Sequence, residues 1–149
     1  MKQKMLRGFG RIRLTDVKTK KPILERTMEN QFCDVFRNAV LTAISDGSSA
    51  VSQAAFVALG TGGAVTGTST ALPNELATRV SASLTVSSSS RLRVTASYDA
   101  THNTGNISNM GIHNHSSNAT LLMGNTFAAS FAKASNQELS VTYDIIFSS

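Results

Sequence analysis

The sequence predicts a mainly β protein: an antiparallel β-sandwich of about seven short strands, with one amphipathic α-helix near the N-terminus. Three observations lead to this prediction. Segments in which apolar and polar residues alternate recur through the last two thirds of the chain. Clusters of Ser, Asn, Asp and Gly separate these segments, as turns do between strands. Apolar residues at sustained helical spacing occur in one stretch.

Length and composition are consistent with a single domain. The chain has 149 residues, enough to bury a hydrophobic core without disulfide or metal support. Charged residues make up 15%, below the usual quarter, and Ser, Thr, Asn, Ala and Gly are abundant. We expect one β-sandwich domain over residues 1–149, with a basic hairpin or arm at 1–29, a helix at 30–47 and a β-rich body at 54–149. Such a polar but weakly charged surface suits a protein that packs among copies of itself.

The N-terminal region carries most of the positive charge. Residues 1–26 hold nine Lys or Arg against two acids, while the whole chain has a net charge of +5. Alternation at Arg11–Thr15 and at Ile23–Thr27, with turn formers from Asp16 to Pro22, predicts a β-hairpin. Two interpretations stay open. The hairpin grips an acidic partner or nucleic acid, or its lysines keep a solvated edge from aggregating.

A single helix is predicted to follow the hairpin. Seven apolar residues repeat at intervals of three and four and form one face: Phe32, Val35, Phe36, Ala39, Val40, Ala43 and Ile44. Asn30 is the expected N-cap, and Gly47 the expected C-terminal stop. We expect the apolar face to pack on a sheet. The lone cysteine, Cys33, lies within this pattern and is interpreted as a small core residue rather than a nucleophile.

The β-rich body contains the remaining predicted strands. They lie at 54–59, 79–86, 91–98, 107–113, 121–131 and 138–147. The second and third of these form a hairpin around a turn at Ser87–Ser90. In the last segment, alternate apolar residues share one face, which predicts a strand deep in a sheet.

The stretch from Leu59 to Arg79, LGTGGAVTGTSTALPNELATR, joins the helix-bearing part of the chain to the β-rich part. Its glycines do not fit a nucleotide-binding loop. Gly62 and Gly67 have the Walker spacing, but Thr68 stands where the phosphate-binding lysine belongs. The dinucleotide fingerprint also fails, because Val65 replaces its third glycine.

The same stretch is instead predicted to be structural. We expect its glycines to let the chain turn sharply out of a buried strand, and its leucines to anchor the return to the core. These residues are Gly60, Gly62, Gly63, Leu72 and Leu76. Glu75 and Arg79 lie four residues apart and are close enough to pair.

Catalytic and metal-binding patterns are weak. His113 and His115 would point to one side of a strand, and His102 could join them, but a structural zinc needs four ligands. The chain has no Gly-x-Ser-x-Gly elbow, and its nine carboxylates offer no obvious pair for glycoside chemistry. We therefore predict a protein that is not an enzyme and that uses no metal or cofactor.

The hydropathy pattern argues against a membrane protein. No apolar run approaches the ~20 residues that span a bilayer. The N-terminus also lacks the apolar core of a signal peptide. We expect a soluble protein that is made in the cytoplasm and has no membrane partner.

Three short motifs occur in order along the chain. Asn30 to Phe32 forms a joint between the basic strand pair and the helix. LGTG at 59–62 follows the first buried strand, and LPNELATR at 72–79 follows a Thr/Ser-rich loop. This order of features, which covers nearly the whole chain, resembles a family of small virion proteins from tailed bacteriophages. One departure is NMGIH at 109–113, where similar proteins carry an acidic residue before Gly-Ile/Leu-Phe.

The resemblance implies a non-enzymatic building block of a phage particle, present in several copies at the neck, tail or fibre attachment. A head-decoration protein is the alternative within this family. The expected partners are copies of the chain and other virion proteins, and the expected location is the virion. The residues expected to contact other subunits are Arg7, Arg11, Arg13, Lys18, Lys20, Lys21, Gly60, Gly62, Leu72, Glu75 and Arg79.

Two other functions stay open besides that of a virion building block. A nucleic-acid-binding β-domain would use the cluster of Arg7, Phe9, Arg11 and Arg13, although aromatic residues are only 6% of the chain. A carbohydrate-binding fibre domain is disfavoured by the presence of two tyrosines and no tryptophan.

Overall fold

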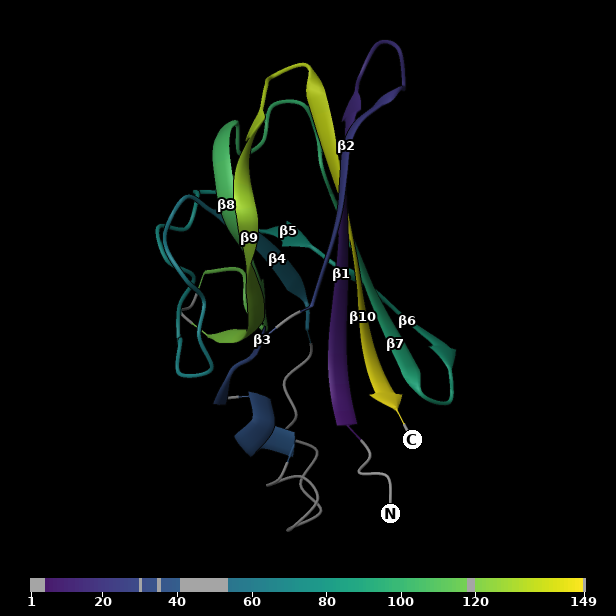
Figure 1. Cartoon of the computed structure of the whole chain (residues 1–149), viewed down its shortest axis with the longest axis vertical. Helices are drawn as coiled ribbons and strands as arrows, with labels where there is room; N and C mark the ends of the chain where they lie inside the picture. The colour runs from purple at the N-terminus through teal and green to yellow at the C-terminus, as the bar shows by residue number, and fades with distance from the viewer. Residues whose placement is uncertain (1–4, 30, 35, 41–53, 118–119, 149) are drawn as a thin grey trace.

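The computed structural model describes residues 5–29, 31–34, 36–40, 54–117 and 120–148. These residues are mainly β, and they form two five-stranded antiparallel sheets that lie against each other, an arrangement consistent with a sandwich (Figure 1). Sheet A contains, in spatial order, β2 (Pro22–Glu29), β1 (Met5–Asp16), β10 (Gln137–Ser148), β7 (Arg91–Tyr98) and β6 (Ser83–Ser88). Sheet B contains β3 (Gln31–Phe32), β9 (Leu121–Lys133), β8 (Gly105–His113), β4 (Phe56–Gly60) and β5 (Val80–Ser81).

Sheet A is built around the long antiparallel pair of β1 and β10. Their register runs from Met5 opposite Ser148 to Asp16 opposite Gln137. β1 also turns back into β2, so the predicted basic hairpin is confirmed and is longer than expected. Alternate residues of β1, such as Ile12, are buried, which leaves the arginines between them on the outer face of the sheet.

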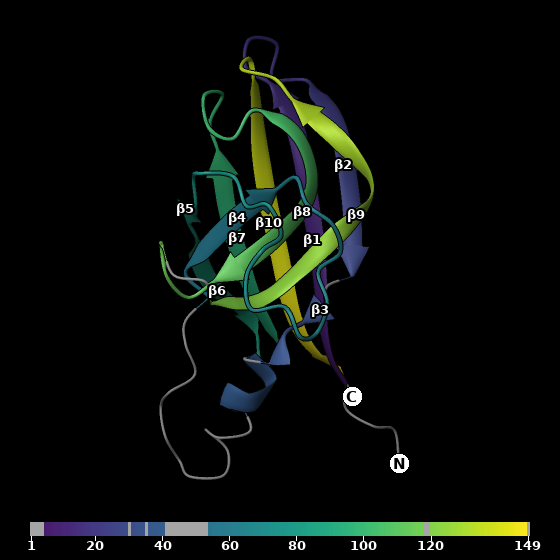
Figure 2. The same cartoon turned by 90° about the vertical axis from the view of Figure 1, so that its left-hand side faces the viewer.

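The core lies between the inner faces of the two sheets. Figure 2 shows β8 and β9 crossing in front of β1 and β10. Buried residues from both sheets form one cluster, which includes Val94, Tyr98, Val141, Tyr143, Val57, Met110, Ile112 and Phe127. The hydroxyl of Tyr98 donates a hydrogen bond to the Val57 carbonyl at 2.6 Å, so a buried polar contact also ties sheet A to sheet B.

The chain passes from one sheet to the other at Ala82. Val80–Ser81 pairs with β4 in sheet B, whereas Ser83–Ser88 pairs with β7 in sheet A. Between them, the backbone N–H of Ala82 donates to the Ala55 carbonyl at 2.8 Å. The prediction of one continuous strand over 79–86 is therefore wrong, because the alternating pattern continues through a residue at which the pairing partner changes.

The predicted count of about seven strands is too low. Ten strands are present among the described residues. The additional strands are β3, where no strand was predicted, and β5, which together with β6 replaces the single strand predicted over 79–86; β3 and β5 are each two residues long. Such short strands are defined by their partners rather than by a pattern of their own.

The outer face of sheet B is covered by residues 61–79, which we call the cover loop (Figure 2). A side chain at Gly111 of β8 would meet the Leu72 side chain of this loop at 3.2 Å. A side chain at Gly124 of β9 would meet Val65 at 3.0 Å. Because the loop covers this face and sheet A covers the other, every residue in 109–113 and in 121–124 is buried.

Only part of the predicted helix can be compared with the structure. The described positions within 34–40 are helical, and the first helical hydrogen bonds go to the Cys33 carbonyl. The helix therefore begins after Cys33, because Gln31–Phe32 pairs with β9 as strand β3. The expected N-cap Asn30 and the expected stop at Gly47 lie outside the described residues. Among the described residues, no helix is long and apolar enough to cross a membrane.

Candidate functional site

The residues predicted to contact other subunits fall on two separate surfaces. The first set lies on the outer face of sheet A and at the tip of its hairpin: Arg7, Arg11, Arg13, Lys18, Lys20 and Lys21. The second set lies in or beside the cover loop, on the outer side of sheet B: Gly60, Gly62, Leu72, Glu75 and Arg79. The structure therefore does not bring the two sets together into one site.

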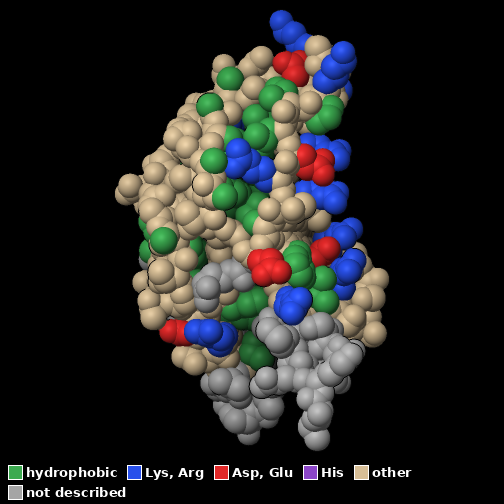
Figure 3. Space-filling model, in the orientation of Figure 1, with side chains coloured by type: hydrophobic (Ala, Val, Ile, Leu, Met, Phe, Trp, Pro, Cys, Tyr) green, Lys and Arg blue, Asp and Glu red, His purple; other side chains and the backbone are tan. Residues whose placement is uncertain are grey.

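The basic face of sheet A is exposed and partly neutralised. Glu25 of β2 contacts Arg13 at 2.8 Å and Arg11 at 3.6 Å, and all three side chains are at least 40% exposed. In Figure 3, Lys and Arg side chains run down the side formed by β1 and β2, with Asp and Glu between them. Exposed ion pairs of this kind stabilise a fold by only ~0–1 kcal/mol, so this face has little influence on folding.

Two further arginines on this face were not among the predicted contact residues. Arg93 of β7 donates to the two carboxylate oxygens of Asp144 on β10 at 2.8 and 2.9 Å, and Arg91 lies 4.0 Å from the same carboxylate. The hydrogen bond from Arg93 lowers the pKa of Asp144. The alternating pattern of 91–98 could have indicated that Arg91 and Arg93 lie on the outer face. Their position near β1 could not be predicted, because it results from the pairing of β10 with both β1 and β7.

A groove of about 500 Å³ crosses the same face. It is lined by Phe9, Gly10, Arg11, Thr27, Met28, Glu29, Arg93, Thr142 and Asp144. Its two arginines are matched by two carboxylates, so the groove carries no net formal charge. A surface of mixed charge complements a polar protein surface better than it complements a polyanion.

The hairpin tip presents its lysines from a fixed turn. The backbone N–H groups of Lys18 and Thr19 donate to Asp16 Oδ1 at 3.0 and 2.8 Å. The hydrogen bonds from Thr19 lower the pKa of Asp16. Lys20 adopts a left-handed backbone conformation with φ 55°, and its ammonium lies 3.4 Å from Glu138. The three lysines are exposed at a tip whose backbone is held by a side chain.

The glycines of the cover loop serve close packing rather than a sharp turn. A Cβ at Gly60 would lie 2.8 Å from the Pro73 carbonyl oxygen, and one at Gly62 would lie 2.5 Å from the same oxygen. Neither glycine has a positive φ, which among the described glycines occurs at Gly105. The prediction of a glycine-dependent turn is thus corrected. Gly63 has open space around its Cβ position, so packing does not require a glycine there.

Two side chains of β8 hold the cover loop on the sheet. The amide nitrogen of Asn109 donates to the carbonyls of Gly63 and Pro73 at 3.2 and 3.1 Å, and the Ser108 hydroxyl donates to Gly62 at 2.7 Å. Asn109 is fully buried. A carboxylate at position 109 would accept rather than donate, and it would face two carbonyl oxygens. The side-chain amide of Asn109, which can donate to both carbonyls, therefore suits this position under the cover loop.

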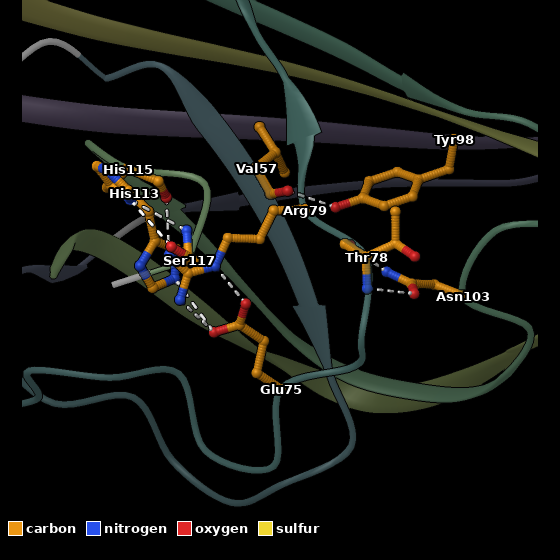
Figure 4. A network of polar contacts seen from close by, with 9 residues as sticks. All are labelled: Val57, Glu75, Thr78, Arg79, Tyr98, Asn103, His113, His115 and Ser117. Atoms are coloured by element: carbon orange, nitrogen blue, oxygen red, sulfur yellow. Dashed lines mark hydrogen bonds and ion pairs between the residues drawn. The ribbon is translucent and has the colours of Figure 1, made fainter. Parts of the chain in front are cut away.

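The other end of the cover loop carries the predicted ion pair. Arg79 donates through Nε and Nη2 to the two carboxylate oxygens of Glu75, the second at 2.8 Å, and its Nη1 donates to the His115 carbonyl at 2.8 Å (Figure 4). The Arg79 side chain is only 7% exposed and that of Glu75 20%. The predicted pairing of Glu75 with Arg79 is confirmed, and its burial makes it structurally more important than the pairs on sheet A.

His113 lies under this ion pair and was not predicted to be buried. Its Nε2 lies 3.7 Å from Glu75, and the side chain is fully buried (Figure 4). Burial and the Arg79 cation lower its pKa to about 4, although Glu75 acts in the opposite direction. His113 is therefore neutral near pH 7. His115, by contrast, is exposed, and its Nδ1 accepts from the Ser117 backbone N–H at 3.2 Å.

Lys133 is a buried cation that sequence reasoning missed. Its ammonium donates to the carbonyls of Asp99 and His102, both at 2.8 Å, and to that of Ala100 at 3.3 Å. Burial lowers its pKa, while the neighbouring Asp99 raises it. Lys133 thus connects the end of β9 to the loop that precedes β8, and its place in an alternating strand offered no sign of this.

The described residues offer little for covalent or metal chemistry. No group of three His, Cys, Asp or Glu in the described ranges is placed to hold a metal ion. Cys33 is buried, as predicted for a core residue, and burial raises the pKa of its thiol to about 11. A protonated thiol is a poor nucleophile.

Comparison with known proteins adds no assignment: no protein family, no curated protein and no solved structure matches this chain.

Proposed function

We propose that this chain is a non-enzymatic β-sandwich component of a tailed-phage virion, present in several copies with neck, tail or fibre proteins. A head-decoration protein is the alternative position in the particle. The proposal rests on the resemblance in the order of motifs along the sequence, together with the way in which the second and third of those motifs are used.

The packing of the cover loop is the observation that carries the proposal. LGTG at 59–62 and LPNELATR at 72–79 supply the ends of this loop, and both contribute to its attachment. The first motif fits against Pro73, and the second provides the buried ion pair of Glu75 with Arg79. The motifs thus fix a loop whose exposed residues are small and uncharged. Such a surface suits a subunit that is packed among others, because it brings no charge whose burial would need a partner.

The basic face of sheet A is the proposed docking surface for a neighbouring subunit. Arg11, Arg13 and Arg93 lie near one another there, each with a carboxylate partner. A matching subunit surface would offer both charges, which favours one orientation over others more than it increases affinity. The proposed partners are therefore copies of the chain and other virion proteins.

The decisive experiment is a mass-spectrometric inventory, with copy numbers, of purified particles from the phage that encodes this chain. The proposal predicts several copies per particle. Charge reversal of Arg11 and Arg13 to Glu should reduce incorporation without loss of folding, because both side chains are exposed. Arg37→Glu, a reversal at another exposed arginine, is the matched control and should be incorporated normally. Particles that lack the chain would overturn the proposal.

A nucleic-acid-binding domain remains the second candidate because of one observation. Arg7, Arg11, Arg13, Arg91 and Arg93 all belong to β1 and β7 on the same outer face, and the partly exposed Phe9 lies among them. If this candidate is correct, affinity for single-stranded DNA should fall steeply with salt. It should also fall in the variant that carries Arg11→Ala and Arg13→Ala. The virion proposal predicts weak binding with little effect of either change.

A further inference from the structure

The free edges of the two sheets differ in how well they are protected against pairing with another strand. Natural proteins protect such edges with charges, proline, bulges or very short strands. On β2, Pro22, Glu25, Arg26 and Glu29 provide proline and charge. In sheet B, the edge strands β3 and β5 are two residues long.

The part of β9 beyond β3 is protected in another way. Phe131 is opposite Ile107 and Thr126 is opposite Asn109, so four residues of β9 stand opposite the single residue Ser108. This bulge interrupts the edge, and Arg26 of β2 donates to the Ala129 carbonyl within it at 2.6 Å. The bulge and the guanidinium together hinder the addition of another strand here.

β6 is the least protected edge among the described strands, because its one irregularity is a register shift between Val86 and Ser88 at its end. It is the last strand of sheet A, and no charged residue or proline occurs from Val80 to Ser90. Its register with β7 is regular from Ser83 to Val86. Figure 1 shows the hairpin of β6 and β7 extending away from sheet B. An uncharged, regular edge of this kind favours pairing with another β-strand.

The inner side of β6, which is the side of sheet A that faces the core, also carries exposed apolar surface. Leu84 is opposite Val94, which is fully buried, and Val86 is opposite Leu92, so these side chains share the inner side of sheet A. Val86 is nevertheless 76% exposed, the larger value of the two exposed large hydrophobic residues in the described chain. The apolar row thus extends out of the core to a position at which nothing in the described chain covers it.

We propose that β6 pairs antiparallel with β6 of a second copy, so that sheet A continues across a two-fold axis at Thr85. This register places Leu84 of each copy opposite Val86 of the other, on the inner side where both are apolar. Thr85 meets Thr85 on the outer side, and no like charges are brought together. Apolar and β-branched pairs across strands each contribute roughly 0.2–1 kcal/mol.

A second copy fits this edge better than a charged partner would. The edge offers backbone donors and acceptors and an apolar pair but no charge, and an identical strand complements it in all three respects. A pair of such short strands buries less surface than the ~1,200 Å² typical of stable complexes, so the dimer should have a dissociation constant on the order of micromolar. The inference rests on the multicopy assembly proposed above for its biological role.

Sedimentation velocity over a concentration series of the purified chain tests this pairing. The wild type should change from monomer to dimer, and Val86→Lys should weaken dimerisation by at least about tenfold. Ile23→Lys, at a 51% exposed position on the opposite edge strand β2, is the matched control and should dimerise like the wild type. A wild type that stays monomeric, or equal weakening by both substitutions, would overturn the proposal.

A cross-linking variant tests the register even if Val86→Lys fails to fold. Thr85→Cys should form a disulfide-linked dimer under mild oxidation, because residue 85 meets itself at the axis, while the native Cys33 is buried. Ile23→Cys should stay monomeric, and an unlinked Thr85→Cys protein would contradict the register. A linked dimer together with particles that lack the chain would remove the virion proposal alone. A chain that is present in particles but never linked would remove the edge pairing alone.

Discussion

The outer faces of the two sheets differ in almost every physical respect. The outer face of sheet A is exposed, and its arginines Arg11 and Arg13 pair with Glu25, a carboxylate that is itself in contact with water. The outer face of sheet B lies under the cover loop, where an amide, a histidine and an ion pair are wholly or largely buried. The same kinds of polar contact therefore contribute differently to stability on the two faces. On sheet A they shape the surface, and on sheet B they hold the fold together.

This difference explains the residue patterns of the strands. A strand with one face in water alternates, as β1 does between buried Ile12 and exposed Arg11 and Arg13. A strand covered on both faces does not alternate, and β8 is buried at every position of 109–113. Polar residues within such a run need partners inside the protein, because water is excluded.

Removal of the Arg79 cation should have the largest effect on stability. Arg79→Met leaves the Glu75 carboxylate without its partner, so the free energy of unfolding should fall by about 3–5 kcal/mol. Arg13→Met removes an exposed partner of Glu25 and should cost ~0–1 kcal/mol. Urea denaturation of both variants provides the comparison. Equal losses would show that the cover loop does not protect its ion pair from water.

Truncation of the loop anchor should have the next largest effect. Leu72 is 4% exposed and packs over Gly111, so Leu72→Ala should destabilise the fold by about 3 kcal/mol. Ile23→Ala, at a half-exposed position on β2, should change stability by less than about 0.5 kcal/mol. Thermal unfolding monitored by circular dichroism is sufficient. Similar melting temperatures for the two variants would contradict a packed cover loop.

Acid should weaken the covered face through His113. Burial lowers the pKa of His113 from 6.5 to about 4, so between these values the unfolded chain binds a proton that the folded chain excludes. Stability should therefore fall as pH decreases from 6.5 to 4, by about 2–3 kcal/mol in total. The lowered pKa values of Asp16, Asp99 and Asp144 reduce stability mainly below pH 3.8 and begin to do so only near pH 5, so they add little over most of this window.

Substitution identifies the source of that pH dependence. His113→Gln should flatten the decrease in unfolding free energy between pH 6.5 and 4, whereas His115→Gln, at an exposed position, should retain it because His113 is still present. Denaturation curves at a series of pH values give both slopes. An unchanged slope in His113→Gln would assign the acid sensitivity to other groups.

Salt should produce the smallest effect and should act on the exposed face. Added salt screens the pairs of Glu25 with Arg11 and Arg13, so stability should decrease by less than about 1 kcal/mol between low salt and 0.5 M. Glu25→Gln should reduce that dependence. Glu75→Gln should leave it, since the pair with Arg79 is shielded from solvent. A salt dependence that followed Glu75 instead would reverse the contrast between the faces.

The parts of the fold that could be predicted from sequence are those in which one face meets water. The N-terminal hairpin and the hairpin around Ser87–Ser90 alternate clearly, and both pairings are present in the structure, whereas the pairing of β7 with β10 was not predicted. The passage between sheets at Ala82 leaves the alternation intact, so no local signal marks it. The start of the helix was predicted too early because an apolar residue, Phe32, suits a helix face and a short strand equally well.

The candidate site could be predicted only where the interaction is local. Glu75 and Arg79 are four residues apart, and their pairing follows from that spacing. Asn109, His113 and Lys133 gain their roles from carbonyls or charges that are far away in sequence. Nothing in their own neighbourhood distinguishes them from surface residues. A single sequence therefore does not reveal which polar residues are buried by contacts with distant parts of the chain.

The central pairing of sheet A has a mechanical consequence. β1 and β10 are antiparallel neighbours, with Met5 opposite Ser148, and Figure 1 shows the start of β1 and the end of β10 at the same end of the sheet. A force that pulls these two ends apart would load the backbone hydrogen bonds one after another, as in opening a zipper. A force between the hairpin tip near Lys20 and the end of β10 would instead load the whole β1–β10 ladder in shear. The protein should thus resist tension along its long axis much better than tension across its termini.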